Sequence, residues 1–181
     1  MAIKTMSHSS GKGIWSDGWH TLTISNAEYG DWNGKKFLDV LFEGYPETFN
    51  LRVFEGINKE TREEFAISKF FKMANAGIID IIKSPDGKQA VQYDDDEEGL
   101  INKSINVFFY KEERNGKSFI KAFNQIAPIA QDGDVISYSD DDVSFWKRVA
   151  EENLEKYRSK DSNVSNTSSH ANETNDEDIP F

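Results

Sequence analysis

Two Asn-Gly pairs, at residues 33–34 and 115–116, each lie between segments in which apolar and polar side chains alternate. Asn-Gly accommodates the positive φ angles of a two-residue turn, so each pair is a strong signal for a β-hairpin. The strands predicted on either side of the two pairs are residues 19–28, 36–43, 104–111 and 118–126. A chain punctuated in this way is predicted to be mainly β.

A third strand and a first helix are predicted between the two hairpins. The strand covers residues 48–54, where apolar side chains alternate with polar ones. The helix follows from apolar residues that recur at helical spacing from Ile67 to Ile78. Thr61 and Glu64 match a capping box at its start, which satisfies backbone N–H groups of the first turn.

A second helix is predicted over residues 141–158, capped by Asp141 or Asp142. Its apolar stripe is expected to dock on the body, where the helix braces the fold or mediates self-association into a homo-oligomer. The predicted order is therefore three strands, a helix, two strands and a helix. A five-stranded barrel with a helix between strands three and four is the OB-fold arrangement. An open α+β sheet with the same order of elements is the alternative.

The chain divides into four parts on this interpretation. The irregular N-terminal arm, the OB-fold single-stranded DNA-binding domain, the connection with the C-terminal helix, and the disordered acidic tail are residues 1–18, 19–130, 131–158 and 159–181. The tail is rich in Ser, Asn, Thr, Asp and Glu and holds almost no apolar group that could enter a core.

Charge is distributed unevenly along the chain. The formal net charge of −11 argues at first against a nucleic-acid partner. However, the tail holds five acids and one base, and two further acid runs, residues 94–98 and 140–142, fall in predicted connections. Such runs are expected to be solvated loops or helix starts rather than metal sites. The distribution of charge is therefore a better guide than its sum.

Catalysis has little support in the sequence. Cysteine is absent, which excludes disulfides, Cys-ligated zinc and thiol catalysis. Neither a phosphate-binding glycine loop nor a hydrolase or metalloprotease motif occurs, so we expect no enzyme, no catalytic residue, no metal and no cofactor. No apolar run approaches the length of a membrane span, and no secretory signal is present, so a cytoplasmic protein without a membrane partner is expected.

Single-stranded nucleic acid is bound by cations that contact phosphates and by aromatic rings that stack on bases. Trp32, in a Gly-flanked polar loop predicted over residues 29–35, is favoured as a stacking residue, whereas each other aromatic has core packing as an equal alternative. The candidate DNA-binding residues on the predicted outer faces and hairpin loops are Trp32, Lys35, Lys36, Arg52, Phe54, Phe108, Tyr110, Lys111, Arg114, Lys117 and Lys121.

The two predicted hairpins share a pattern. Residues 29–37 and 110–119 each begin with Tyr, contain Asn-Gly-Lys and end with Phe. In an OB-fold these segments join strands one to two and four to five, the loops that grip oligonucleotides. We interpret the similarity as shared hairpin chemistry rather than as a duplication.

The end of the chain carries a second candidate site. An acidic run changes abruptly to an apolar tip at the C-terminal carboxylate, in Asp176, Glu177, Asp178, Ile179, Pro180 and Phe181. Phe181 can fill an apolar pocket of a partner protein while its carboxylate pairs with a basic residue there. Pro180 stiffens the tip and lowers the entropy lost on docking.

This tip resembles that of bacterial single-stranded DNA-binding proteins, whose tails end in an acidic run followed by Ile-Pro-Phe. The body is more similar to phage-encoded OB-fold single-stranded DNA-binding proteins, in its Asn-Gly-Lys hairpins around one helix that ends in an Ala-x-Ala-Gly step, here residues 74–77. The resemblance implies sequence-independent binding of single strands in DNA replication, recombination and repair, in the cytoplasm of a bacterium or a phage-infected host.

The resemblance also implies that the tip recruits a polymerase, primase, helicase or nuclease. A competing hypothesis remains at this point. An acidic interaction module or DNA mimic would use the same tip to dock replication proteins without binding DNA itself.

Overall fold

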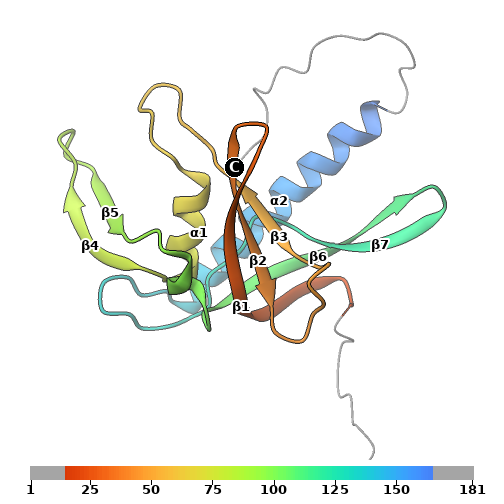
Figure 1. The fold of residues 1–181 in the computed structure, drawn as a ribbon, viewed down its shortest axis with the longest axis horizontal. Coiled ribbons are helices and arrows are strands. Elements are labelled where there is room, and N and C mark those ends of the chain that lie inside the picture. Colours follow the sequence, from red (N-terminus) through yellow and green to blue (C-terminus); the bar gives the residue numbers. More distant parts are fainter. Residues whose placement is uncertain (1–14, 165–181) are drawn as a thin grey trace, which may run out of the picture.

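The computed structural model describes residues 15–164 (Figure 1). The strands are β1 (Gly18–Trp32), β2 (Lys35–Phe42), β3 (Leu51–Phe54), β4 (Ile78–Lys83), β5 (Gln89–Tyr93), β6 (Ser104–Arg114) and β7 (Lys117–Ala122). The helices are α1 (Ala66–Ala74), the short 3-10 helix η1 (Glu97–Leu100) and α2 (Asp140–Val164). The protein is mainly β, with antiparallel sheets and two α-helices, as predicted.

The main sheet has five strands in the order β3-β2-β1-β6-β7. The central strand, β1, pairs with β6 along residues 18–23 and with β2 along residues 24–32. Its register shifts between Ile24 and Asn26, where a bulge allows one long strand to serve two partners. Within the described residues no ladder joins the outer strands β3 and β7, so no closed barrel is present among them.

The core lies on one face of this curved sheet. Alternate residues of the strands are fully or almost fully buried, among them Leu38, Val40, Leu51, Ile105 and Phe109. The buried side of α1, with Phe70 and Phe71, covers them. The alternation read from the sequence therefore assigned the inward face of β2, β3 and β6 correctly.

Both predicted Asn-Gly turns are confirmed. Asn33 and Gly34 have φ angles of 52° and 78°, and Asn115 and Gly116 have 52° and 72°, as a two-residue hairpin requires. The strands β1 and β6 are longer than predicted, so Trp32 is the last residue of β1 rather than part of a loop, whereas β7 ends four residues before the predicted end. The predicted third strand is shorter, because the segment before Leu51 turns, with the N–H of Phe49 donating to the carbonyl of Pro46.

The start of α1 differs from the predicted capping box. The helix begins at Ala66, and the Glu64 carboxylate accepts hydrogen bonds from the N–H groups of Ala66, Ile67 and Ser68 at 2.8 Å each. Thr61 takes no part in this cap. A single carboxylate thus satisfies three N–H groups of the first turn.

The end of α1 also differs from the prediction. The helix ends at Ala74, and the following Asn75 adopts the left-handed conformation that closes many helices. Gly77 and Ile78, which were predicted to end the helix, instead lead into the β4–β5 hairpin. This hairpin forms a second, two-stranded sheet that projects from the body on the side away from the β6–β7 hairpin (Figure 1).

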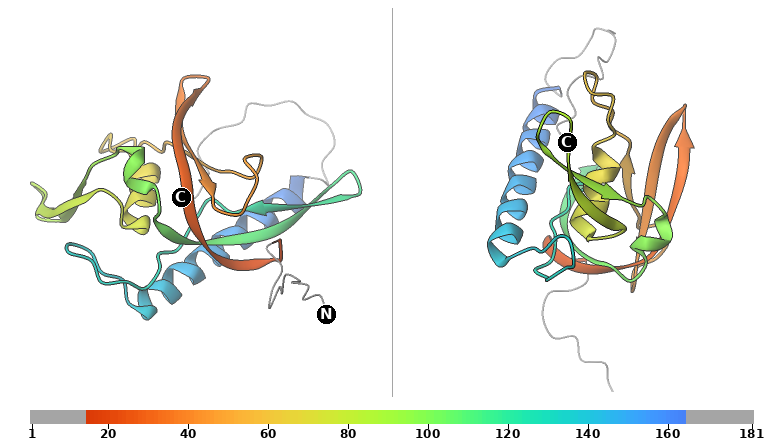
Figure 2. Two further views of the ribbon diagram at one scale, coloured as in Figure 1. Left: turned by 60° about the horizontal axis from the view of Figure 1, so that its bottom comes forward. Right: turned by 90° about the vertical axis from the view of Figure 1, so that its left-hand side faces the viewer.

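The helix α2 lies along one flank of the body, with the β1–β2 hairpin on the opposite flank (Figure 2). Its buried residues Ala150 and Leu154 pack against Phe123 and, on the outer face of β6, Phe108. It begins at Asp140, two or three residues earlier than a cap at Asp141 or Asp142 would place it. Ser139 and Asp142 cap it reciprocally, since each backbone N–H donates to the other side chain.

The helix α2 ends at Val164, six residues beyond the predicted end. No helix in residues 15–164 is long and apolar enough to cross a membrane.

Candidate nucleic-acid interface

Three aromatic rings gather on the outer face of β1, β2 and β3, near the turn of the β1–β2 hairpin. The ring centroid of Phe54 lies 6.3 Å from that of Trp32 and 5.7 Å from that of Phe37. Trp32 is 59% exposed, and Phe37 and Phe54 are partly exposed. We call these rings, together with the cations Lys35 and Arg52 beside them, the aromatic face.

The register of the strands builds this face. Phe37 lies directly opposite Phe54 in the β2–β3 ladder, and Trp32 lies opposite Lys35 at the end of the β1–β2 ladder. Phe37 also lies opposite Gly30, where an added Cβ would come within 2.2 Å of the Phe37 ring. The ring of Phe37 therefore covers the backbone of a residue that has no side chain.

Cations lie among these rings. The Arg52 guanidinium stands 3.8 Å from the Phe37 ring centroid and makes a bidentate bond to Asp39, at 2.7 and 2.6 Å. The hydrogen bond to Asp39 raises the pKa of Arg52 above its ordinary value. Lys35 Nζ lies 5.7 Å from the Phe54 ring centroid. Stacking surface and positive charge are thus combined on one face, as single-stranded nucleic acid requires.

The β6–β7 hairpin carries four further predicted cations, and three of them, Arg114, Lys117 and Lys121, lie on one face of it. Arg114 Nε bonds to Glu112 Oε1 at 2.8 Å, and Lys121 Nζ pairs with the other oxygen of the same carboxylate. Lys117 lies opposite Arg114 at the turn, and its side chain is exposed. Bonds from Lys121 and Arg114 lower the pKa of Glu112, so this carboxylate stays charged.

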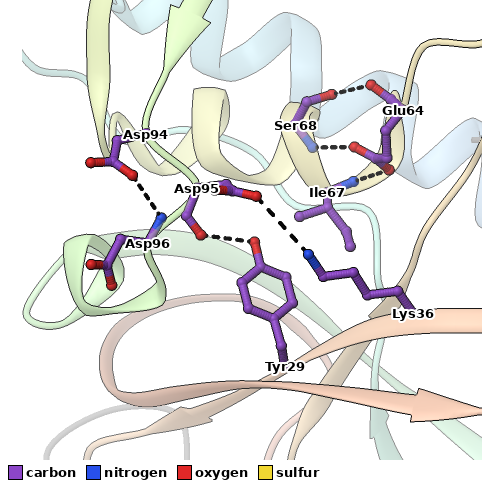
Figure 3. A network of polar contacts seen from close by, with 8 residues as sticks. All are labelled: Tyr29, Lys36, Glu64, Ile67, Ser68, Asp94, Asp95 and Asp96. Carbon is purple, nitrogen blue, oxygen red and sulfur yellow. Dashed lines mark hydrogen bonds and ion pairs between the residues drawn. The ribbon is translucent and has the colours of Figure 1, made fainter.

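Lys36 lies on the other face of β2, away from the aromatic face. Its Nζ stands 3.9 Å from the Tyr29 ring centroid and 4.0 Å from an oxygen of Asp95 (Figure 3). The Tyr29 hydroxyl donates to the Asp95 carbonyl at 3.0 Å. Burial, and then the charge of Asp95, raises the pKa of Tyr29. Lys36 therefore connects β2 to the acidic loop, residues 94–98, and we leave Lys36 out of the proposed interface.

The acidic loop itself is largely explained by local structure. The Asp96 carboxylate accepts from the N–H of Glu98 and caps η1, and Asp94 accepts from the N–H of Asp96. These bonds agree with the prediction of a helix start. Within residues 15–164 no group of three or more His, Cys, Asp or Glu side chains is placed to hold a metal ion.

Two of the predicted stacking residues pack beneath α2. Phe108 contacts Trp19 at 5.2 Å between ring centroids, and Tyr110 contacts Phe123 at 6.4 Å. Burial raises the pKa of Tyr110. Both rings pack against the cluster that contains Leu154. Core packing, the alternative to base stacking, therefore explains their position.

Lys111 lies in register with Ile120, on the face of β6 opposite Tyr110. We leave Phe108, Tyr110 and Lys111 out of the proposed interface.

Two aromatic residues that the sequence analysis did not select stand beside the predicted ones. They are Phe37 and Phe119, and Phe119 is 46% exposed. Both hold the same place in the repeated pattern Asn-Gly-Lys-x-Phe, three residues after the glycine. The similarity of the two hairpins was thus a signal that could have found them.

The interface that remains combines cations that are paired with carboxylates and cations that are not. Five cations, Lys35, Arg52, Arg114, Lys117 and Lys121, stand against the carboxylates of Asp39 and Glu112 that pair with them. Within residues 15–164 neither Lys35 nor Lys117 has a carboxylate within 4.0 Å, so their charges are available to phosphates.

The predicted partner-binding tip, residues 176–181, lies outside the described residues. Neither a protein-family model nor a curated protein matches the chain.

Proposed function

We propose that this protein binds single-stranded DNA without sequence preference and without catalysis, through the aromatic face and the β6–β7 hairpin. One observation carries the proposal: Trp32, Phe37 and Phe54 form an exposed cluster with cations among the rings. Because every base has a π-face, such a cluster holds a strand of any sequence. The protein would coat and protect single strands during DNA replication, recombination and repair.

The proposed domain is an OB-fold barrel over residues 19–130. The sheet order supports this assignment, because β3 and β7 are the outer strands and a barrel closes where the two outer strands meet. The position of α1 after β3 and before β6 also agrees with it. The β4–β5 hairpin is then an insertion between the helix and the fourth barrel strand.

The binding test is fluorescence anisotropy of the full-length protein with labelled oligo-dT, repeated across a salt series. We expect tight binding at about 50 mM salt that weakens as salt rises, because phosphate contacts release counterions. Trp32→Ala should weaken binding about tenfold, since one stacked base contributes about 1–3 kcal/mol.

The matched control is Tyr157→Ala, since Tyr157 is 50% exposed on α2. It should bind as the wild type does. Absence of wild-type binding at about 50 mM salt would contradict the proposal and favour the acidic interaction module.

We also propose that the C-terminal tip recruits a replication or repair protein, such as a polymerase, primase, helicase or nuclease. Removal of Phe181 alone should abolish retention of such a partner on immobilised protein, because the apolar anchor is lost. Anisotropy with oligo-dT should be unchanged. Equal retention of the partner by the truncated and complete chains would contradict the recruitment role and leave strand binding unaffected.

A further inference from the structure

A groove lies on the open side of the sheet, between residues 48–50, which lead into β3, and the β6–β7 hairpin. We call it the groove between β3 and β7. Its volume is about 440 Å³, within the range of about 300–1,000 Å³ that small-ligand sites occupy. It is lined by Thr48, Phe49, Asn50, Arg114, Phe119, Ile120, Lys121 and Ala122. The groove therefore combines apolar surface with two cations.

Phe49 provides a preformed apolar wall. Its ring lies 5.1 Å from that of Phe109, which is fully buried, and 5.0 Å from that of Trp15. These contacts hold Phe49 in place, so a ligand would not have to order it. The ring of Phe119 is exposed, and no other ring contacts it in the part of the chain described here. A flat apolar ligand would find one fixed wall and one uncovered ring.

The cationic side of the groove is held by one carboxylate. Glu112 pairs with both Arg114 and Lys121, which fixes the distance between the two cations and leaves them with a positive excess. Such a pair suits an anionic oxygen, such as that of a phosphate, better than it suits a neutral ligand. A base with its attached phosphate matches both parts of the groove.

The groove continues the aromatic face along the backbone of β3. Asn50 lines the groove, Arg52 is two residues further on, and Phe54 belongs to the aromatic face. Five residues separate Phe49 from Phe54, which are at most about 17 Å apart, because Phe49 lies in a bend before β3. A stacked single strand rises about 3.4 Å per nucleotide, so at most about five nucleotides cover this span.

We infer that the groove between β3 and β7 is a second nucleotide site, which takes one base of a single strand against Phe49 and Phe119 and its phosphate on Arg114 and Lys121. The inference rests on the proposed function, since the same strand would first cross the aromatic face. The protein would then bind single-stranded DNA at two sites connected by β3, the aromatic face and this groove. We call these two sites the stations.

The test compares Phe119→Ala with Phe145→Ala in the full-length chain. Both phenylalanines are 46% exposed, but Phe145 lies on α2 and forms no part of either station. Anisotropy is measured with labelled dT12, which can reach both stations, and with dT4, which is too short to span them. Phe119→Ala should weaken binding of dT12 about tenfold and leave dT4 within twofold, and Phe145→Ala should change neither.

A crosslinking experiment keeps the inference testable whatever the stability of the variants. Oligo-dT with one 5-iododeoxyuridine at successive positions is irradiated with the wild-type protein, and the modified residues are mapped by mass spectrometry. Crosslinks to Trp32 and to Phe119 or Phe49 should come from positions about five nucleotides apart.

Crosslinks to Trp32 alone, with equal dT12 affinity for the two Phe variants, would overturn the second site and leave the proposed function standing. Failure of wild-type protein to bind either oligonucleotide would overturn both.

Discussion

At Gly30, the absence of a side chain decides how the next strand presents an aromatic ring. The Phe37 ring covers the Gly30 backbone, with its nearest atom 2.2 Å from where a Cβ would be. The same ring carries the Arg52 guanidinium at 3.8 Å. Gly30 thus sets the position of a ring and, through that ring, of a cation.

Gly30→Ala should therefore weaken binding of oligo-dT several-fold, because the added methyl group displaces the Phe37 ring from its position over β1. The free energy of unfolding should change by less than about 1 kcal/mol, since the group that must move is the end of a side chain. Anisotropy and urea unfolding measure the two effects.

Gly99→Ala is the control, because its Cβ would have no neighbour closer than 3.8 Å. A Gly30→Ala protein that binds like the wild type would show that the position of Phe37 does not matter for the interface.

Lys35 and Lys36 show how far residue-level prediction can go. Both were selected for their charge beside Trp32, but neighbouring residues of a strand point to opposite faces. The alternation of Leu38, Val40 and Phe42 already placed Lys36 on the inward side and Lys35 on the outward side. The partner of Lys36, Asp95, is far away in sequence, and no local pattern predicts that contact.

The β6–β7 hairpin is an element whose charges depend on one another. Glu112 holds Arg114 and Lys121, and these bonds lower its pKa. A carboxyl group with a lowered pKa in the folded state stabilises the fold above the pH at which the unfolded chain titrates, about 4.3. This stabilisation is lost as the pH falls through the folded-state pKa.

We consequently expect the free energy of unfolding to fall less between pH 6 and pH 3 in the Glu112→Gln variant than in the wild type. The difference should not exceed about 2 kcal/mol, because Glu112 makes two ion pairs and exposed ion pairs contribute about 0.2–1 kcal/mol each. Urea unfolding at several pH values measures it. The control is Glu113→Gln, since Glu113 has no ion pair within residues 15–164. Parallel curves for Glu112→Gln and the wild type would contradict the prediction.

Elements with a strong local signal were predicted, and those without one were not. Asn-Gly fixes a turn through backbone conformation alone, so both hairpins were found. The β4–β5 hairpin was missed because Ile78 fits the helical spacing of the residues before it, while the Ile-rich segment after it does not alternate. The start of α1 was misplaced because Thr61 and Glu64 have the spacing of a capping box, but only Glu64 reaches the helix.

For the molecule as a whole, the sequence predicted the five strands of the main sheet and their order along the chain, but not which aromatic rings would be covered. Phe108 and Phe54 were equal candidates, because both lie on outward faces of strands. Phe108 is covered because α2 packs on β6, and a helix of that length has no local signal for the strand it will meet. The docking surface of α2 depends on contacts distant in sequence, which is why that part of the site needed the structure.

Many of the acids behind the net charge of −11 have structural roles. In the described residues, acids cap helices at Asp96 and Asp142, bind Lys36 at Asp95 and hold cations at Glu112. Within residues 15–164, Lys35 and Lys117 of the candidate interface have no carboxylate within 4.0 Å. A total charge therefore says little about where a phosphate would meet the surface.

The β4–β5 hairpin has a practical consequence. It belongs to a separate two-stranded sheet, and its connection to the body runs through Tyr93, whose ring contacts Phe71 of α1 at 5.4 Å. Its turn, between Lys83 and Gln89, is exposed and remote from both proposed stations (Figure 1). Exposed turns of this kind tolerate inserted sequence. A fluorophore or an affinity handle placed there would let single molecules be immobilised and observed while both proposed stations stay open to solution.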